Sequence, residues 1–139
     1  NHYIAIHKYL FEDIYPFAGK FREENIGKGE FRFASFEYIE PELDRILEQL
    51  KKENFLEGLS KHELAKRLAY YLSELNVLHP FREGNGRTNR EFIRQLALKN
   101  GYVLNLKNAT PQDVLNASIK SVIDTTNLEE IIEEMLEKE

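Results

Sequence analysis

The strongest constraint in this sequence is a loop that joins two segments with clear helical periodicity. Before the loop, one helical face carries the apolar residues Leu64, Leu68, Tyr71, Leu72 and Leu75. After it, the buried face of a second helix is formed by Phe92, Ile93, Leu96 and Ala97. His79-Pro80 ends the first periodic segment, and Gly84 and Gly86 keep the next few residues non-helical. The sequence therefore predicts a loop over residues 79–90 between two well-determined helices.

The ends of these two helices also carry recognisable signals. Ser60-Lys-His-Glu63 is a capping-box pattern, with Ser60 as the N-cap of the first helix. The second helix is expected from about Arg87 to Lys99, with Gly101 at its C-cap.

The other segments are mostly helical too. A helix is expected around residues 3–11, and Pro16 and Gly19 follow its end. Residues 20–34 alternate partly between apolar and polar around Gly27-Lys28-Gly29, which predicts a β-hairpin. Three further helices are expected: one with Pro41 in its first turn, one opened by Thr110-Pro111-Gln-Asp113, and a very acidic one from near Asn127. Residues 1–139 read as one mainly helical, all-α domain with a small β-hairpin.

Composition excludes several classes of function. The chain has no cysteine, so disulfides and thiolate metal sites are excluded, which fits a reducing cytoplasm. No apolar run approaches the roughly 20 residues that span a bilayer, and no signal-peptide pattern is present, so no membrane partner is expected. The net charge of −5 disfavours nucleic acid as a partner. Asn1 in place of Met suggests a processed or trimmed piece of a longer protein.

Positive charge is nevertheless concentrated in one stretch, which contains Arg82, Arg87, Arg90 and Arg94. Gly84-Asn85-Gly86 can turn successive amides toward one anion, and the following helix adds its own N-terminal amides and dipole. Arg87 and Arg90 are three residues apart and share a helix face. This arrangement predicts a site for an anion with several charges in a row, such as a triphosphate.

Two more residues of the loop suggest chemistry beside that anion. A carboxylate at Glu83 would repel phosphates unless Mg²⁺ lies between them, and Mg²⁺ is usually held by one or two carboxylates plus substrate phosphates. A neutral imidazole at His79 is suited to accept a proton from an attacking hydroxyl.

The loop resembles the signature of the Fic family. His79-Pro-Phe-Arg-Glu-Gly-Asn-Gly-Arg-Thr-Asn-Arg90 matches His-x-Phe-x-Asp/Glu-Gly-Asn-Gly-Arg-x-x-Arg at every defined position. The resemblance extends upstream to Asp13-Ile-Tyr-Pro-Phe-Ala-Gly19 and to Arg22–Ile26 and Phe31–Ala34, which are similar to the family's N-terminal part and its flap hairpin. It implies a helical Fic core and a protein adenylyltransferase, which transfers AMP from Mg-ATP to a Ser, Thr or Tyr hydroxyl and releases pyrophosphate.

The resemblance also implies roles for single residues. His79 would be the general base and Glu83 the Mg²⁺ ligand. Nucleotide binding would fall to Gly84, Asn85 and Gly86 around the α- and β-phosphates, to Arg87 at the β-phosphate and to Arg90 at the γ-phosphate. The flap would align the target protein by strand-like pairing, through Asn25, Ile26, Gly27, Lys28, Gly29 and Phe31.

Other interpretations remain open at this point. The fold also serves other phospho-transfer, although the intact Gly86 argues against the kinase type, and a catalytically silent nucleotide-binding or interaction module would not require His79. Taken singly, Gly-Asn-Gly is a turn and the arginines are a solvated helix face. His2, His7 and His62 are expected at the surface or in the core, since no metal-ligand spacing joins them.

Many Fic enzymes are inhibited by a helix with the pattern Ser/Thr-x-x-x-Glu-Gly/Asn. Thr125…Glu129 and Thr126…Glu130 have the spacing, but Gly or Asn follows neither, so Glu129 and Glu130 are only candidate autoinhibitory residues. The inhibitory segment is expected to be trimmed from this chain, with an antitoxin-like partner or the C-terminal helix as the alternatives. The expected setting is a bacterial toxin–antitoxin system in the cytoplasm, or delivery into a host cytoplasm as an effector.

Overall fold

The structure, a computed structural model, describes residues 1–28, 31–105 and 126–139, and the helix expected at Thr110–Asp113 lies outside them. The helices are α1 (His2–Phe11), α2 (Ile39–Lys52), α3 (Lys61–Leu78), α4 (Asn85–Lys99) and α6 (Thr126–Met135). Short 3-10 turns cover Phe36–Tyr38 and Asn54–Leu56. The strands are β1 (Gly27–Lys28), β2 (Phe31–Arg32), β3 (Tyr102–Leu104) and β4 (Leu136–Lys138). The expectation of a mainly helical fold is confirmed.

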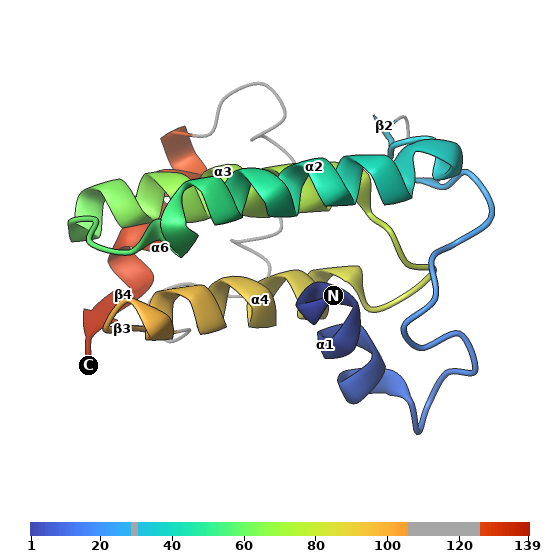
Figure 1. The fold of residues 1–139 in the computed structure, drawn as a ribbon, viewed down its shortest axis with the longest axis horizontal. Coiled ribbons are helices and arrows are strands. Elements are labelled where there is room, and N and C mark those ends of the chain that lie inside the picture. Colours follow the sequence, from blue (N-terminus) through green and yellow to red (C-terminus); the bar gives the residue numbers. More distant parts are fainter. Residues whose placement is uncertain (29–30, 106–125) are drawn as a thin grey trace.

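Helix α3 is the centre of the molecule, because it packs against α2, α4 and α6 (Figure 1). Its apolar residues leave almost no surface exposed; Leu64, Leu68 and Leu75 are each at 0%. The predicted N-cap is confirmed, since Ser60 Oγ accepts a hydrogen bond of 3.2 Å from the Glu63 amide. Helix α3 therefore begins at a defined residue, and the 79–90 loop follows its C-terminal end.

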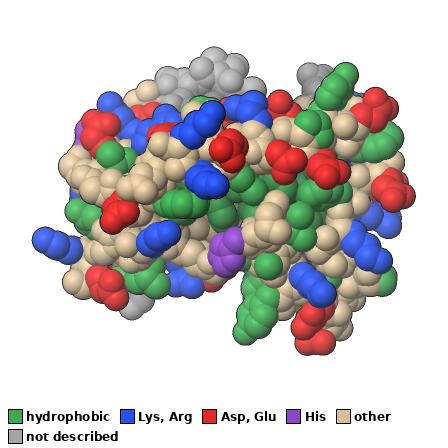
Figure 2. Space-filling model, viewed as in Figure 1, with side chains coloured by type: hydrophobic (Ala, Val, Ile, Leu, Met, Phe, Trp, Pro, Cys, Tyr) green, Lys and Arg blue, Asp and Glu red, His purple; other side chains and the backbone are tan. Residues whose placement is uncertain are grey.

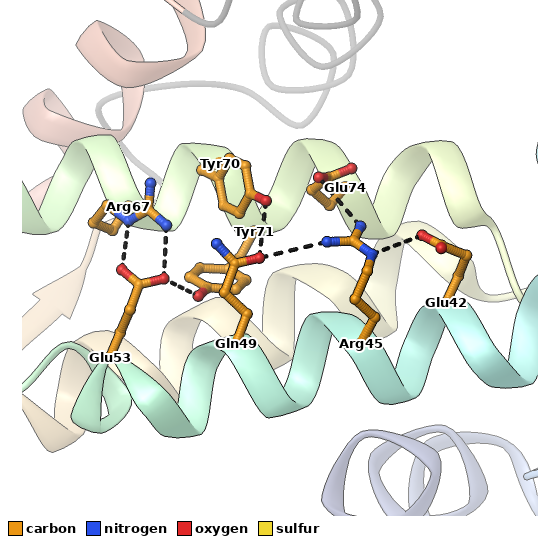
Figure 3. Close-up of polar contacts among 8 residues, drawn as sticks. All are labelled: Glu42, Arg45, Gln49, Glu53, Arg67, Tyr70, Tyr71 and Glu74. Atoms are coloured by element: carbon orange, nitrogen blue, oxygen red, sulfur yellow. Dashed lines mark hydrogen bonds and ion pairs between the residues drawn. The ribbon is translucent and has the colours of Figure 1, made fainter.

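Helix α2 is fastened to α3 by a row of polar contacts as well as by its apolar face (Figure 3). Arg67 of α3 donates two hydrogen bonds, of 2.7 and 2.6 Å, to the carboxylate of Glu53 at the end of α2. The Tyr71 hydroxyl donates to the same carboxylate, and the Tyr70 hydroxyl donates to Gln49 at 3.0 Å.

Helix α4 begins at Asn85, two residues earlier than expected, and Gly86 lies inside its first turn. The expectation that both glycines keep this stretch non-helical is therefore wrong for Gly86. Only Gly84 has a positive φ, of 82°, and this single left-handed residue suffices to turn the chain into the helix.

The flap hairpin is present but short. Its paired strands are antiparallel, with Gly27 opposite Arg32 and Lys28 opposite Phe31. The flanking residues of the expected 20–34 hairpin bond elsewhere, since the Arg22 amide donates to Pro80 O at 2.9 Å and the Ala34 amide to Val77 O at 3.0 Å. Both legs of the flap are thus attached to the end of α3 and to the loop that follows.

The acidic C-terminus forms a helix and then a strand. Helix α6 starts one residue before the expected Asn127, but the chain leaves it at Leu136 and pairs as β4 with β3, antiparallel, with Val103 opposite Glu137. No pattern in the sequence predicts this second sheet. Figure 1 shows α6, β3 and β4 at one end of the long axis and the loop after α3 at the other end.

A groove with a volume of about 670 Å³ runs between α2 and α4. Figure 2 shows hydrophobic side chains gathered there, with acidic side chains along the α2 side. Its apolar lining includes Leu47, Leu50, Phe55, Phe92 and Leu96, and no residue of the 79–90 loop lines it.

Among the described helices, none combines the length and the apolar composition that a membrane-spanning helix requires.

Candidate active site

The 79–90 loop rests on a buried aromatic pair. Phe81 is fully buried, and its ring stacks on the His7 imidazole of α1 with 3.7 Å between centroids and 11° between planes. The Gly19 amide donates to His7 Nδ1 at 2.9 Å, so the ring proton is on Nε2, which donates to the Glu83 carbonyl at 2.9 Å. Burial lowers the pKa of His7 and keeps this ring neutral. Helix α1 thereby fixes the backbone of the loop through His7.

Asn85 closes the loop from within. Its side chain accepts from the Phe81 amide at 2.9 Å and donates to the Phe81 carbonyl at 2.7 Å. Because that side chain is buried and committed to the backbone, only the main-chain amide of Asn85 is placed to bind a ligand.

The first turn of α4 is suited to bind an anion. The amides of Asn85, Gly86 and Arg87 have no carbonyl acceptor within the helix, and the Gly84 N-cap has no side chain to cap them. These amides and the helix dipole favour negative charge at this point.

A side chain at either glycine of the loop would approach a neighbour closely. A Cβ at Gly84 would lie 2.4 Å from Phe11 Cε2, at a position whose φ is already +82°. A Cβ at Gly86 would lie 3.1 Å from Arg90 Nη1. The guanidinium of Arg90 is therefore folded back over the first turn of α4, where it faces the helix N-terminus.

Arg87 and Arg90 form a pair of like charges beside this turn. Burial and then the charge of Arg87 lower the pKa of Arg90. Across the described residues, neither side chain has a carboxylate within ion-pair distance. A polyanion bound here would relieve their repulsion. Arg94 is not part of the pair, because its guanidinium binds Glu91 at 2.6–3.1 Å on the exposed face of α4.

His79 is the C-cap of α3 and has the left-handed conformation, with φ 47° and ψ 62°. This conformation is uncommon and strained for a residue with a Cβ, and such strain is often found at functional sites. The half-buried imidazole stacks on Phe33 of the flap, with centroids 3.7 Å apart and planes at 10°. The flap and the candidate base are therefore in direct contact.

Glu83 lies along the chain between His79 and the first turn of α4, and its side chain is exposed. No group of three or more acidic or histidine side chains that could hold a metal occurs among the described residues. One exposed carboxylate beside a phosphate-binding turn fits Mg²⁺, which needs few protein ligands when phosphates supply the others.

The structure brings together the predicted residues of the loop but not all of the other candidates. Asn25 Oδ1 accepts from the Phe36 amide at 2.9 Å and closes the base of the flap, while Gly29 lies outside the described residues. Glu129 and Glu130 are on α6, which packs on α3 at the end of the molecule opposite the loop (Figure 1).

Three contributors were not identified from the sequence. The sequence places His7 only at the surface or in the core, gives Phe33 no contact with His79, and gives Arg22 only a position within a segment that resembles the family. Each acts through contacts to residues far away in the sequence, and His7 and Glu83 are 76 positions apart. A buried His or a buried Arg that bonds to the backbone of a distant segment has no local sequence signal.

Comparisons with known proteins identify the family of this chain. Residues 1–97 match the family model described as Fic/DOC family. The chain is 45% identical over 128 residues to Protein adenylyltransferase VbhT of Bartonella schoenbuchensis, covering 92% of the chain and 27% of that protein. It is 47% identical over 103 residues to Probable protein adenylyltransferase Fic of Salmonella typhimurium, covering 74% of the chain and 52% of that protein. The chain thus spans about half or less of the length of these two relatives.

Solved structures show the same fold. The BepC protein of Bartonella tribocorum with bound AMPPNP superposes with a TM-score of 0.88 at 25% identity, covering 99% of this chain and 74% of that one. The N-terminal Fic domain of a Bartonella quintana effector protein with bound ADP gives a TM-score of 0.89 at 26% identity, covering 99% and 72%. On its sequence match and its fold, this chain belongs to the Fic/DOC family.

Proposed function

We propose that this chain is the catalytic domain of a protein adenylyltransferase, which transfers AMP from Mg-ATP to a Ser, Thr or Tyr hydroxyl of a target protein. The observation that carries the proposal is the position of His79. Its imidazole is held by the flap at the end of the same loop whose other end forms the anion-binding turn of α4. The curated relatives named as protein adenylyltransferases and the ATP-analogue complex of a structural neighbour support this assignment.

The proposed reaction gives each of these groups a role. Amides of the α4 first turn hold the α- and β-phosphates, and Arg87 and Arg90 hold the β- and γ-phosphates. The target hydroxyl gives its proton to His79 while its oxygen attacks the α-phosphorus. A new oxygen–phosphorus bond forms, the bond between the α-phosphorus and the bridging oxygen breaks, and pyrophosphate leaves. Bound through Glu83 and the phosphates, Mg²⁺ would supply charge neutralisation. The flap would present the target segment by backbone pairing.

The first test is intact-mass analysis after incubation with Mg²⁺ and each nucleoside triphosphate in turn. An added AMP mass on this chain or on lysate proteins is the expected result. Transfer of another group would identify a different phospho-transfer, and no adduct on any protein would contradict the proposal.

The role of His79 is tested by replacing it with alanine. We expect His79→Ala to reduce AMP transfer by roughly 100-fold or more, the size of a general-base contribution, and to leave Mg-ATP affinity nearly unchanged. His62→Ala is the matched control, because His62 is exposed and binds Glu133 near the other end of α3. A His79→Ala protein that labels a target from α-labelled ATP at the wild-type rate would show that the mechanism is wrong.

Inhibition by Glu129 or Glu130 stays a prediction. In the inhibitory pattern that the resemblance implies, the Glu pairs with the second arginine of the loop, here Arg90. Such a pair would require α6 to leave its position on α3, or a second chain to supply the carboxylate. A rise in AMP transfer by Glu129→Gln or Glu130→Gln would support an inhibitory role, and unchanged transfer in both would contradict it.

A further inference from the structure

Arg22 is a buried cation that donates hydrogen bonds to four backbone carbonyls. The residue is only 2% exposed. Nε donates to His79 O at 2.6 Å, and Nη2 donates to Leu78 O at 3.1 Å. Nη1 donates to Glu24 O at 2.7 Å, and Nη2 also donates to Ala34 O. One guanidinium thus binds the end of α3 and both legs of the flap.

Such a buried charge is expensive to maintain unless it is compensated. Burial lowers the pKa of Arg22, and the charge of Glu24 opposes this shift. The Glu24 carboxylate is itself exposed, however, and lies 3.1 Å from Arg82 Nε. The compensation at hydrogen-bond distance comes instead from carbonyls, two of them at the negative end of the α3 dipole. An apolar side chain could fill the same volume at lower cost, so the guanidinium is retained for what it connects.

The Arg22 guanidinium connects His79, the candidate base, with the flap, which would present the target. The two carbonyls at the end of α3 belong to Leu78 and His79, and the latter carries the imidazole in its left-handed conformation. Ala34 follows Phe33 directly, and the Phe33 ring stacks on that imidazole at 3.7 Å. Holding Ala34 O and His79 O on one planar fork therefore fixes the register of the Phe33–His79 stack.

We propose that Arg22 is a positioning residue for the transfer reaction, which keeps the flap and His79 in one fixed arrangement. The proposal rests on the proposed function for its effect on AMP transfer, but its geometric part does not depend on that activity. The Arg22 guanidinium does not touch the reacting atoms. It sets where the hydroxyl presented by the flap lies relative to the imidazole.

A positioning role for Arg22 affects kcat for AMP transfer and the affinity for ATP differently, whereas a purely structural role would affect both together. The phosphate-binding turn of α4 is held by Asn85 and His7, not by Arg22. Losing the fork should therefore lower kcat for AMP transfer while the affinity for ATP stays the same. Lysine keeps the charge but not the planar fork, so Arg22→Lys should show the same separation as Arg22→Gln with less loss of stability.

The experiment compares Arg22→Lys and Arg22→Gln with Arg67→Lys and Arg67→Gln. Arg67 is the matched control, because its fork also binds a partly buried partner, Glu53, but on the α2–α3 interface away from the loop (Figure 3). Each variant is measured for thermal stability, for Mg-ATP affinity by calorimetry and for AMP transfer from α-labelled ATP to the chain's own hydroxyls and to lysate proteins. The ring signals of the four histidines are followed by NMR, with His79 assigned from the signal missing in His79→Asn.

Stacking on Phe33 should displace the His79 ring signals upfield in the wild type. We expect Arg22→Lys to remove this displacement and to lower kcat roughly 10- to 100-fold, the scale of a misplacement of about 1 Å, with Mg-ATP affinity within about twofold of wild type. The Arg67 variants should lose stability but keep both the displacement and kcat per folded molecule.

Two results would overturn the inference. Wild-type His79 signals in a folded Arg22→Lys protein would show that Arg22 does not hold the ring. Parallel losses of stability and activity in the Arg22 and Arg67 variants would show a structural role alone. If the wild type adds AMP to nothing, the proposed function fails, and the ring signals still decide whether Arg22 holds His79.

Discussion

Gly84 is under two separate constraints, and Gly58 provides a comparison with only one. Both have a positive φ, of 82° and 85°, but nothing lies within 4 Å of a Cβ at Gly58, whereas Phe11 lies 2.4 Å from one at Gly84. Gly58→Ala should therefore lower the free energy of unfolding by about 1–2 kcal/mol, the cost of a left-handed alanine. Gly84→Ala should lose clearly more, because Phe11 must move as well. Chemical denaturation of both variants measures the difference, and equal losses would show that Phe11 is not in the way.

Gly86 is limited by a neighbour and not by its backbone angles. It is inside α4, where alanine is favoured over glycine by roughly 0.5–1 kcal/mol, but a Cβ would meet Arg90 Nη1 at 3.1 Å. We therefore expect Gly86→Ala to keep or raise the free energy of unfolding while it weakens ATP binding by about tenfold, the loss of roughly one charge-assisted hydrogen bond. Titration calorimetry with Mg-ATP checks the second effect. Wild-type affinity in a stabilised Gly86→Ala would contradict this account of the glycine.

Between the elements, the contact of α2 with α3 carries a charge pair that responds to pH. The hydrogen bond from Arg67 holds the pKa of Glu53 below its ordinary value of 4.5, and the Tyr71 hydroxyl adds to this effect. The unfolded chain therefore takes up a proton at Glu53 before the folded chain does. The stability from this pair is complete above pH 4.5 and is lost as the pH falls through the lower pKa of the folded state.

Glu53→Gln should consequently be less stable at pH 7, by about 1–2 kcal/mol for a partly exposed charged hydrogen bond, and less sensitive to acid. Thermal unfolding from pH 7 down to pH 3 measures both effects. Glu42→Gln is the control, since Glu42 pairs with Arg45 at a side-chain exposure of 45–46% and should cost little. If the thermal stability of Glu53→Gln falls between pH 7 and pH 3 as much as that of the wild type, other groups cause the pH dependence.

The elements that could be predicted are those specified by nearby residues. The period of Leu64–Leu75 and the Ser60 cap define α3 locally, and the motif residues fall into one loop because they are consecutive. Strand β4 could not be predicted, because Leu136–Lys138 is too short for a pattern and becomes a strand only by pairing with β3. The flap is shorter than expected for the same reason, since the main-chain amides of Arg22 and Ala34 donate to Pro80 O and Val77 O and not across the hairpin.

On the scale of the whole molecule, the site and much of the stabilising core lie at different ends. The loop and the flap meet at one end of α3, while α6 and the β3–β4 sheet pack at the other (Figure 1). Within the described residues, the α3–α4 pair runs from one region to the other, and in it Asn89 Nδ2 donates to Asn76 Oδ1 at 2.7 Å. A loss of packing on α6 should therefore reduce stability without changing the geometry of the loop.

Ile132→Ala tests this separation. Ile132 is only 1% exposed on α6, so its truncation should lower the free energy of unfolding by about 2–5 kcal/mol. Below the unfolding transition, Mg-ATP affinity per folded molecule should equal that of the wild type, because the anion-binding amides belong to the first turn of α4. His7→Leu, a comparable change under the loop, should lower stability and affinity together, since it leaves the Glu83 carbonyl and the Gly19 amide without their partner. Denaturation and calorimetry on both variants compare the two ends directly. A weakened affinity in Ile132→Ala would show instead that α6 and the site are coupled through α3, and would give the C-terminal helix a route to regulate the loop.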